Sequence, residues 1–376
     1  MEFEVDKEIL LKSISINDSI ISSKNINTIL SNCLFNVTTN EIEIITTDNE
    51  INIKTSLDAI SDMSDSFTVN GKNFYNLLKE LPKGNVVVNI NDSYTIDIKS
   101  KHLNAHYQLI GTSIDNYPEM ITLHNKNLIE IDQSLLRYMI KKVIYAAAID
   151  TLVPSFNGIL FLSDAKGMIT LVSSDSRRLS IITRSLDNDI EIEKGIIIPL
   201  KTINEIYKLL GTDGKCTFSL HDKQCFFSIG KTEIISKIID DVFPNYKLVL
   251  PESSEVVVYI QTEKIIESIR RALVFTRGPA YRITLNLTKD VLTIKAKTPD
   301  LGEAEEDVFI ESNIEDKLSI ALNAQYFFDS IKEIDSSSIK LSITNQKNPI
   351  IISPENDSDY ISVIMPFVIK NSNDNE

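Results

Sequence analysis

An internal repeat constrains the fold of this chain more than any other feature of its sequence. A short apolar segment followed by a helical pattern occurs three times, at 67–69 with 74–81, at 196–199 with 203–210, and at 318–321 with 326–334. A second unit, a helical pattern followed by paired strand patterns, starts near residues 11, 135 and 265. Both recur about every 125 residues, the size of an ordinary domain. The chain therefore reads as three similar domains, unless the likeness is chance in a sequence rich in Ile, Asn and Lys.

Most of the remaining segments alternate apolar and polar residues, as half-buried strands do. They lie at 41–45, 51–54, 86–90, 94–98, 217–220, 291–296 and 339–343. Helical periodicity is clearest at 72–81, 134–142, 201–210, 264–273 and 324–334. Short polar turns between the strand patterns favour antiparallel hairpins. We predict an α+β fold in which each domain packs two helices on antiparallel sheet, with domains at 1–123, 124–253 and 254–376.

The composition, 43% hydrophobic and 24% charged residues, is that of a folded soluble chain. Cys33, Cys216 and Cys225 show no C-x-x-C spacing, which argues against disulfides and structural zinc and favours a reducing compartment. The first residues lack the apolar core of a secretory signal, and no apolar run approaches the ~18–20 residues of a spanning helix. We expect a cytoplasmic protein.

The net charge of −15 would repel nucleic acid if it were spread evenly. It is not spread evenly, because the helical patterns carry most of the unopposed cations. Arg137, Lys141 and Lys142 stand in one helix without an acid, while acid gathers at 58–62, 187–193 and 303–307. If the repeated helices share one surface, that surface can hold phosphates. The alternative is that these lysines and arginines only solvate the outer faces of amphipathic helices.

Motifs for catalysis are missing from the sequence. Neither G-x-x-x-x-G-K-[ST] nor G-x-G-x-x-G occurs. His102 and His106 are four residues apart, but they stand in a strand-like segment, where that spacing does not bring them together as on a helix. Asp240 and Asp241 could hold Mg²⁺, but no second acidic motif completes such a site. We expect a protein that is not an enzyme and has no cofactor and no metal. The rival hypothesis is a carbohydrate- or metabolite-acting enzyme on duplicated α+β domains, with Asp240 and Asp241 as its acidic pair.

Four short segments carry a resemblance to a known family. They are S-S-D-S-R-R-L at 173–179, F-P-N-Y at 243–246, E-A-E-E at 303–306 and V-I-M-P at 363–366. In order and spacing, the chain resembles the bacterial sliding clamps, the beta subunits of DNA polymerase III. The resemblance implies a head-to-tail homodimeric ring around duplex DNA, with the helices lining the pore and the sheets outside. Such a ring gives the replicative polymerase its processivity, hydrolyses nothing, and needs a clamp loader.

The resemblance also implies where DNA binds, independently of base sequence. By matching position it assigns Lys24 and Lys201, and charge reasoning adds Lys79, Lys83, Arg137, Lys141, Arg270 and Arg271. Pro154 and Ser155 stand where some relatives have aromatic residues near DNA, so that contact is in doubt. A scaffold that does not bind DNA would lose no function when these helix cations are neutralised.

A hydrophobic cleft for short peptides of the polymerase catalytic subunit, the clamp loader and other replication and repair proteins is the second implied site. It would comprise Phe156, Ser174, Arg177, Arg178, Leu179, Pro244, Val249, Val363, Met365, Pro366 and Phe367. Apolar walls suit Leu or Phe anchors, and Arg178 suits polar or carboxylate groups. Without the resemblance, these residues could equally be an ordinary core between domains. Three departures stand out: Ser176-Arg177 replaces the commoner Gly-His, Val368 stands where Arg is common, and a polar tail, expected to be disordered, follows from Lys370 to Glu376.

The ring interface is implied to pair the strand near 101–109 with the third domain. Its residues would be His106, Tyr107, Leu109, Val274, Phe275, Asp300, Glu303 and Glu305.

Overall fold

The computed structural model describes residues 1–18, 20–21, 28–101, 103–118, 128–164, 166–186, 192–251, 253–276 and 281–368. Six α-helices lie in these ranges: α1 (Lys7–Asp18), α2 (Gly71–Glu80), α3 (Gln133–Val143), α4 (Leu200–Leu209), α5 (Thr262–Leu273) and α6 (Ala324–Ile331). Short 3₁₀ helices are η1 (Thr28–Ser31), η2 (Ile144–Ala146), η3 (Pro154–Asn157) and η4 (Tyr246–Val249). None of the helices in the described ranges is long and apolar enough to cross a membrane.

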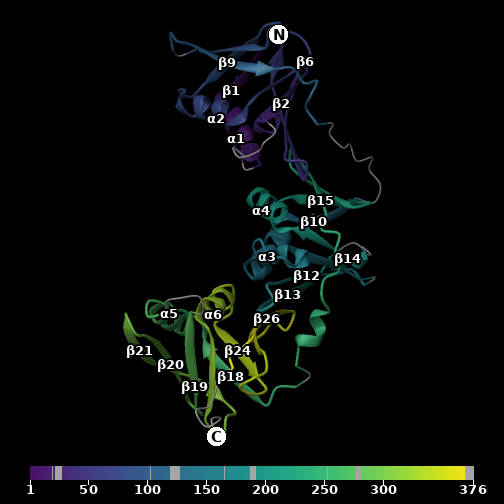
Figure 1. Ribbon diagram of the computed structural model, residues 1–376. Helices are drawn as coiled ribbons and strands as arrows, with labels where there is room; N and C mark the ends of the chain where they lie inside the picture. Colours follow the sequence, from purple (N-terminus) through teal and green to yellow (C-terminus); the bar gives the residue numbers. More distant parts are fainter. Residues whose placement is uncertain are drawn as a thin grey trace. The chain divides into compact units, whose positions relative to one another are not determined.

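The chain divides into two compact units. The first joins Met1–Ser134 to Asn204–Ile238, and the second joins Leu135–Ile203 to Ile239–Glu376. Figure 1 labels helices and strands from each third of the chain, coloured from purple at the N-terminus to yellow at the C-terminus. Each unit thus draws on part of the central third of the chain.

A thirteen-stranded antiparallel sheet organises the first unit, in the order β10-β15-β16-β17-β4-β3-β2-β6-β9-β8-β7-β1-β5. Its strands are β1 (Glu2–Asp6), β2 (Asn32–Val37), β3 (Glu41–Thr47), β4 (Ile51–Asp58), β5 (Ile60–Ser61), β6 (Asp65–Asn70), β7 (Asn85–Ile90), β8 (Thr95–Ser100), β9 (His106–Thr112), β10 (Ile129–Asp132), β15 (Lys215–His221), β16 (Gln224–Ile229) and β17 (Thr232–Lys237). Pairing of β17 with β4, with Ile234 opposite Ile53, carries the sheet from the first third of the chain into the central third.

Two sheets organise the second unit, in the orders β14-β11-β12-β13-β26-β25-β24-β18-β22 and β21-β20-β19-β23. The strands are β11 (Gly158–Ser163), β12 (Met168–Ser174), β13 (Arg178–Ser185), β14 (Ile192–Pro199), β18 (Val256–Gln261), β19 (Arg282–Leu287), β20 (Val291–Thr298), β21 (Gly302–Phe309), β22 (Glu311–Ser312), β23 (Leu318–Asn323), β24 (Ser338–Ile343), β25 (Ile350–Pro354) and β26 (Tyr360–Ile364). Here β13 pairs with β26, so the central and last thirds also share a sheet.

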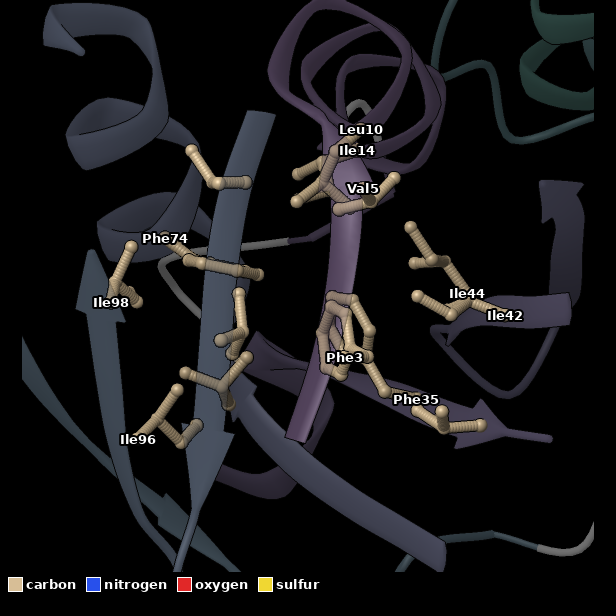
Figure 2. Packing of buried hydrophobic residues seen from close by; sticks show 14 of the residues in the cluster. Phe3, Val5, Leu10, Ile14, Phe35, Ile42, Ile44, Phe74, Ile96 and Ile98 are labelled. Atoms are coloured by element: carbon tan, nitrogen blue, oxygen red, sulfur yellow. The ribbon is translucent and has the colours of Figure 1, made fainter. Parts of the chain in front are cut away.

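Stacked phenylalanines fill the core of the first unit. Because side chains alternate along a strand, β1 turns Phe3 and Val5 inward, where Figure 2 shows them between two groups of buried side chains. The rings of Phe35 and Phe67 stack with their centroids 4.9 Å apart, and Phe74 of α2 meets Phe35 edge to face at 5.6 Å. The α1 and α2 helices pack on each other and add Leu10, Ile14, Phe74 and Leu78 to this core, and α5 and α6 pack on each other in the second unit (Figure 1).

The repeat predicted from the sequence corresponds to a strand that leads into a capped helix. Asn70 ends β6, and its side chain accepts a hydrogen bond from the Asn73 amide at the start of α2. Asn323 ends β23 and accepts from the Tyr326 amide in the same way at the start of α6. Such caps satisfy amides that the first helical turn leaves unpaired. The predicted helices and strands are confirmed, with ends that differ by a few residues.

Candidate binding cleft and basic helix faces

The second unit contains an apolar cleft of about 220 Å³. Residues from η3, the β12–β13 turn, the segment around η4, and the end of β26 line it: Phe156, Ser174, Ser176, Arg177, Arg178, Leu179, Phe243, Pro244, Asn245, Tyr246, Val249, Val363 and Met365. Segments distant in sequence thus meet at one surface because β13 and β26 are neighbours in the sheet.

The buried strands supply the apolar base of the cleft. Leu179 of β13 and Val363 of β26 are opposite each other in the antiparallel register, and both are buried. They belong to a cluster with Leu160, Val172, Ile181 and Ile197. Phe156 meets Phe243 edge to face at 5.9 Å, which fixes one aromatic side of the cleft. The cleft therefore has a rigid apolar base and aromatic side chains that are only half-buried.

The β12–β13 turn is held by side-chain to backbone hydrogen bonds. One carboxylate oxygen of Asp175 accepts from the amides of Arg177 and Arg178, both at 2.9 Å. The Ser174 hydroxyl donates to the Arg178 carbonyl at 2.8 Å. Ser176 has a φ of 73°, in the left-handed region that favours glycine. This is the residue that replaces the commoner glycine noted in the sequence, so the turn keeps its shape at a cost in backbone strain.

Arg178 makes its contacts within the protein. Its guanidinium lies 3.0 Å from the Asp175 carboxylate and 2.9 Å from that of Asp329 on α6, and its side chain is 11% exposed. It also stacks over the Tyr326 ring at 4.3 Å. The sequence analysis expected Arg178 to bind polar groups of a ligand, but its guanidinium group is already bonded to Asp175 and to Asp329 of α6. Arg177 is the arginine of the cleft that is exposed to solvent.

Nine of the eleven residues predicted for the cleft line it, and two do not. Pro366 and Phe367 lie just beyond the lining, where the Phe367 amide donates to the Ala321 carbonyl at 2.7 Å and the chain bridges to β23. The prediction missed Ser176, Phe243, Asn245 and Tyr246. The F-P-N-Y motif was the signal for the last three, since the motif was noted but only its proline was assigned to the cleft.

The cations predicted to contact DNA differ in exposure. Lys79, Lys83, Lys201 and Arg270 are exposed, and Arg137 is half-buried. Lys141 lies 3.5 Å from Glu333, and Arg271 donates two hydrogen bonds to the Glu306 carboxylate, at 3.0 and 2.6 Å. Lys24 lies outside the described residues.

The structure corrects the interpretation of Lys142 and adds Lys72. Lys142, counted in the sequence as part of a basic helix face, is buried, where it pairs with Asp335 at 2.6 Å and lies over the Tyr138 ring at 4.8 Å. Lys72 is exposed as the second residue of α2, and Lys201 is the second residue of α4.

Several strands in the described residues pair on one side only over part or all of their length, and β9 and β21 are two of them that carry predicted interface residues. From His106 to Ile110, β9 pairs with β8 on one side only, and β21 pairs only with β20. Near these edges Ile110 is 83% exposed, Phe309 86% and Val274 68%. Open edges with exposed apolar side chains are typical of strands that pair with another chain.

The predicted interface residues lie on or beside these edges. His106 pairs with Asp97, Glu303 with Lys297 and Glu305 with Lys295, each at 2.8 Å. Tyr107, Leu109 and Phe275 are half-buried, whereas Asp300 is exposed. Ile110 of β9 and Phe309 of β21 are exposed on the same strands, and the sequence analysis did not name either of them.

The acidic pair of the rival enzyme hypothesis has a structural use. One oxygen of the Asp241 carboxylate accepts from the Ser155 amide at 3.1 Å, and the other accepts from the Val242 amide at 2.8 Å. Across the described ranges, no group of three or more His, Cys, Asp or Glu residues is placed to hold a metal ion. Asp241 thus joins the segment before η4 to the segment at η3.

Repeated α+β units, continuous antiparallel sheets, cationic helix faces and an apolar cleft together define a clamp-type binding protein. Three family models match in order along the chain: DNA polymerase III beta subunit N-terminal domain at residues 1–121, central domain at 130–245, and C-terminal domain at 247–368. The chain belongs to the DNA polymerase III beta subunit family, the bacterial sliding clamps. Its function is that of a non-catalytic processivity factor in DNA replication.

Relatives and solved structures extend over the whole chain. The beta sliding clamp of Halalkalibacterium halodurans is 23% identical over 97% of this chain and 99% of the relative, and that of Staphylococcus aureus is 23% identical over 98% and 99%. The crystal structure of the Bacillus subtilis DNA polymerase sliding clamp matches with a TM-score of 0.92 at 21% identity, covering 98% of this chain and 100% of that one. The Pseudomonas aeruginosa DNA polymerase III subunit beta matches with a TM-score of 0.90 at 23% identity and the same coverage.

Proposed function

We propose that two copies of the chain close head to tail into a ring around duplex DNA. The observation that carries this proposal is that β9, from His106 to Ile110, and β21 each lack a neighbouring strand on one side. Because they are different strands of the chain, β9 of one copy can pair with β21 of another copy. A contact between different surfaces of two copies is heterologous, and it closes into a ring when the rotation permits. The exposed side chains of Ile110, Phe309 and Val274 would then be buried between the copies.

The ring would hold DNA through phosphates rather than bases. Lys79, Lys201 and Arg270 are exposed on helices and Lys83 is exposed just after α2, so they would contact the phosphates of B-DNA without reading its sequence. Lys72 joins this set, whereas Arg271 must share its guanidinium between Glu306 and a phosphate. Topological enclosure makes high affinity unnecessary, so attachment is independent of sequence and the ring can slide.

The cleft would receive short peptides of the replicative polymerase catalytic subunit, the clamp loader and other replication and repair proteins. Its buried base of Leu179 and Val363 accepts apolar anchors, the half-buried Phe156 and Phe243 flank them, and the exposed Arg177 offers a polar contact. Cleft and ring are distinct, so one partner can be tethered while DNA is enclosed. Cys33, Cys216 and Cys225 are buried and form no disulfide, which suits the reducing cytoplasm in which these partners act.

Site-specific crosslinking tests the head-to-tail ring. Burial raises the pKa of Cys216 and of Cys225 to about 12, and Cys33 is buried, so a bis-maleimide reacts with introduced surface cysteines first. We expect Ile110→Cys/Phe309→Cys to give a covalent dimer, and either single variant to stay monomeric on a denaturing gel. Dimers from a single variant would show a symmetric contact instead, and no dimer from any variant would contradict the ring.

A further inference from the structure

Next to the cleft, the chain exposes an apolar surface that no contact described so far uses. Leu152 is 100% exposed, Ile149 81% and Val242 85%. We call these three residues the apolar rim. Single exposed apolar residues are common on proteins, but here three of them lie on two segments that the hydrogen bond from the Ser155 amide to Asp241 joins.

The loop that carries Ile149 and Leu152 is held in one shape by its own hydrogen bonds. The Thr151 amide donates to the Asn157 side chain, which donates in turn to the Thr151 carbonyl, both at 3.0 Å. The Ala148 amide donates to the Phe156 carbonyl at 2.9 Å, and the Phe156 amide donates to the Val153 carbonyl at 3.1 Å. The loop therefore presents Leu152 to solvent from a fixed frame, which lowers the entropy lost on binding.

The apolar rim is continuous with the cleft. Phe156, which closes this loop, also lines the cleft and contacts Phe243. The bond from the Ser155 amide to Asp241 ties the loop to the residue before Val242. A peptide that leaves the cleft beside Phe156 therefore leaves it at the loop that carries Leu152.

Carboxylates accompany the apolar rim. Asp150 lies between Ile149 and Leu152, and Asp240 and Asp241 directly precede Val242; all three are exposed. A peptide that places apolar side chains on the apolar rim would lie beside these carboxylates. Their negative charge favours lysine or arginine in the same peptide segment.

We propose that the apolar rim binds the residues that flank the anchor of a partner peptide, and that this flank combines apolar with basic side chains. The proposal rests on the proposed peptide-binding role of the cleft. It adds a second contact, and it assigns to the loop around Pro154 and Ser155 a role in choosing among partners rather than in contacting DNA.

Three fluorescein-labelled synthetic peptides test the proposal by anisotropy. The first is short, with one leucine and one phenylalanine anchor; the second adds Leu-Lys-Leu-Lys at both ends; the third adds Ser-Lys-Ser-Lys. We expect the Leu-Lys peptide to bind the wild type about tenfold more tightly than the Ser-Lys peptide, since one buried leucine supplies that much. Leu152→Ser/Val242→Ser should remove this preference and leave the short peptide unchanged. Ile60→Ser, at a residue 77% exposed in the other unit, is the matched control.

Each other outcome overturns the proposal. Equal affinities for the Leu-Lys and Ser-Lys peptides, or a preference that survives in the double variant, would show that the apolar rim binds no flank. If the double variant weakens retention on DNA or dimer formation but not peptide binding, the apolar rim serves DNA or a second copy. If the short peptide itself fails to bind the wild type, the proposed function of the cleft is wrong as well.

Discussion

The guanidinium group of Arg178 lies 2.9 Å from the carboxylate of Asp329, which joins the cleft to α6. Asp329 also accepts hydrogen bonds from Gln325 at 3.0 Å and Lys332 at 2.7 Å on the same helix. The β12–β13 turn that shapes the cleft and the α6 helix are therefore parts of one hydrogen-bonded network.

Replacing Arg178 tests that network. Arg178→Met leaves the carboxylates of Asp175 and Asp329, each 13% exposed, without their shared cation. We expect a loss of about 1–3 kcal/mol in stability, because a partly buried charge is left uncompensated. Thermal unfolding of the dimer measures it. Arg177→Met, one residue away at an exposed position, is the control and should unfold at the wild-type temperature; an equal loss in both variants would contradict the assignment.

Ser176→Gly tests the strain in the β12–β13 turn. Glycine adopts the φ of 73° without the penalty that serine has there, although it gains freedom in the unfolded chain. The net effect should be a gain of about 0.5 kcal/mol, seen as a small rise in the unfolding temperature. Ser228→Gly, in the middle of β16, should instead lower the unfolding temperature. A loss of stability at both positions would show that the turn is not strained.

The Arg271–Glu306 pair predicts a pH dependence. Hydrogen bonds from Arg271 hold the pKa of Glu306 below its ordinary value of 4.5, against an opposing effect of partial burial. A carboxyl group whose pKa is lowered in the native state stabilises it above the unfolded pKa. That contribution is lost as the pH falls through the lower, native pKa. Below about pH 4.5, unfolding temperatures of the wild type should therefore fall more steeply than those of Glu306→Gln.

In Arg271→Met, the unfolding temperature should also fall less steeply below about pH 4.5 than in the wild type, because this variant lacks the hydrogen bonds that lower the pKa of Glu306. Parallel curves for the wild type and both variants would contradict this account of the pair.

Salt dependence separates the two arginines at the end of α5. Arg270 is exposed and lies over the Phe328 ring at 5.8 Å, whereas Arg271 is already bonded to Glu306. We expect Arg270→Ala to lower the slope of log affinity for duplex DNA against log salt by about 0.9, the value for one phosphate contact. Arg271→Ala should lower it by less. The reverse order, measured by anisotropy on a labelled duplex, would place Arg271 nearer the phosphates.

Local pattern and repeat were enough to predict the helices and most strands, because amphipathic periods and caps such as Asn70 and Asn323 are encoded in short segments. Long-range pairing was not predictable in the same way. The registers of β17 on β4 and of β13 on β26 depend on contacts between segments far apart in sequence.

In the candidate site, motifs located the cleft, but they gave no sign that Arg178 is bonded to Asp329 or that Lys142 is buried. Charge counts along a helix do not show which cation turns inward, and partners such as Asp335 and Glu306 lie in other elements.

Retention on circular DNA tests the central claim of a closed ring most directly. The protein would be loaded by its clamp loader onto nicked circles and moved into high salt, which weakens phosphate contacts, and half of the circles would then be linearised. The ring predicts that protein stays on the intact circles and is lost rapidly from the cut ones. Equal loss from both would contradict enclosure and leave at most electrostatic binding.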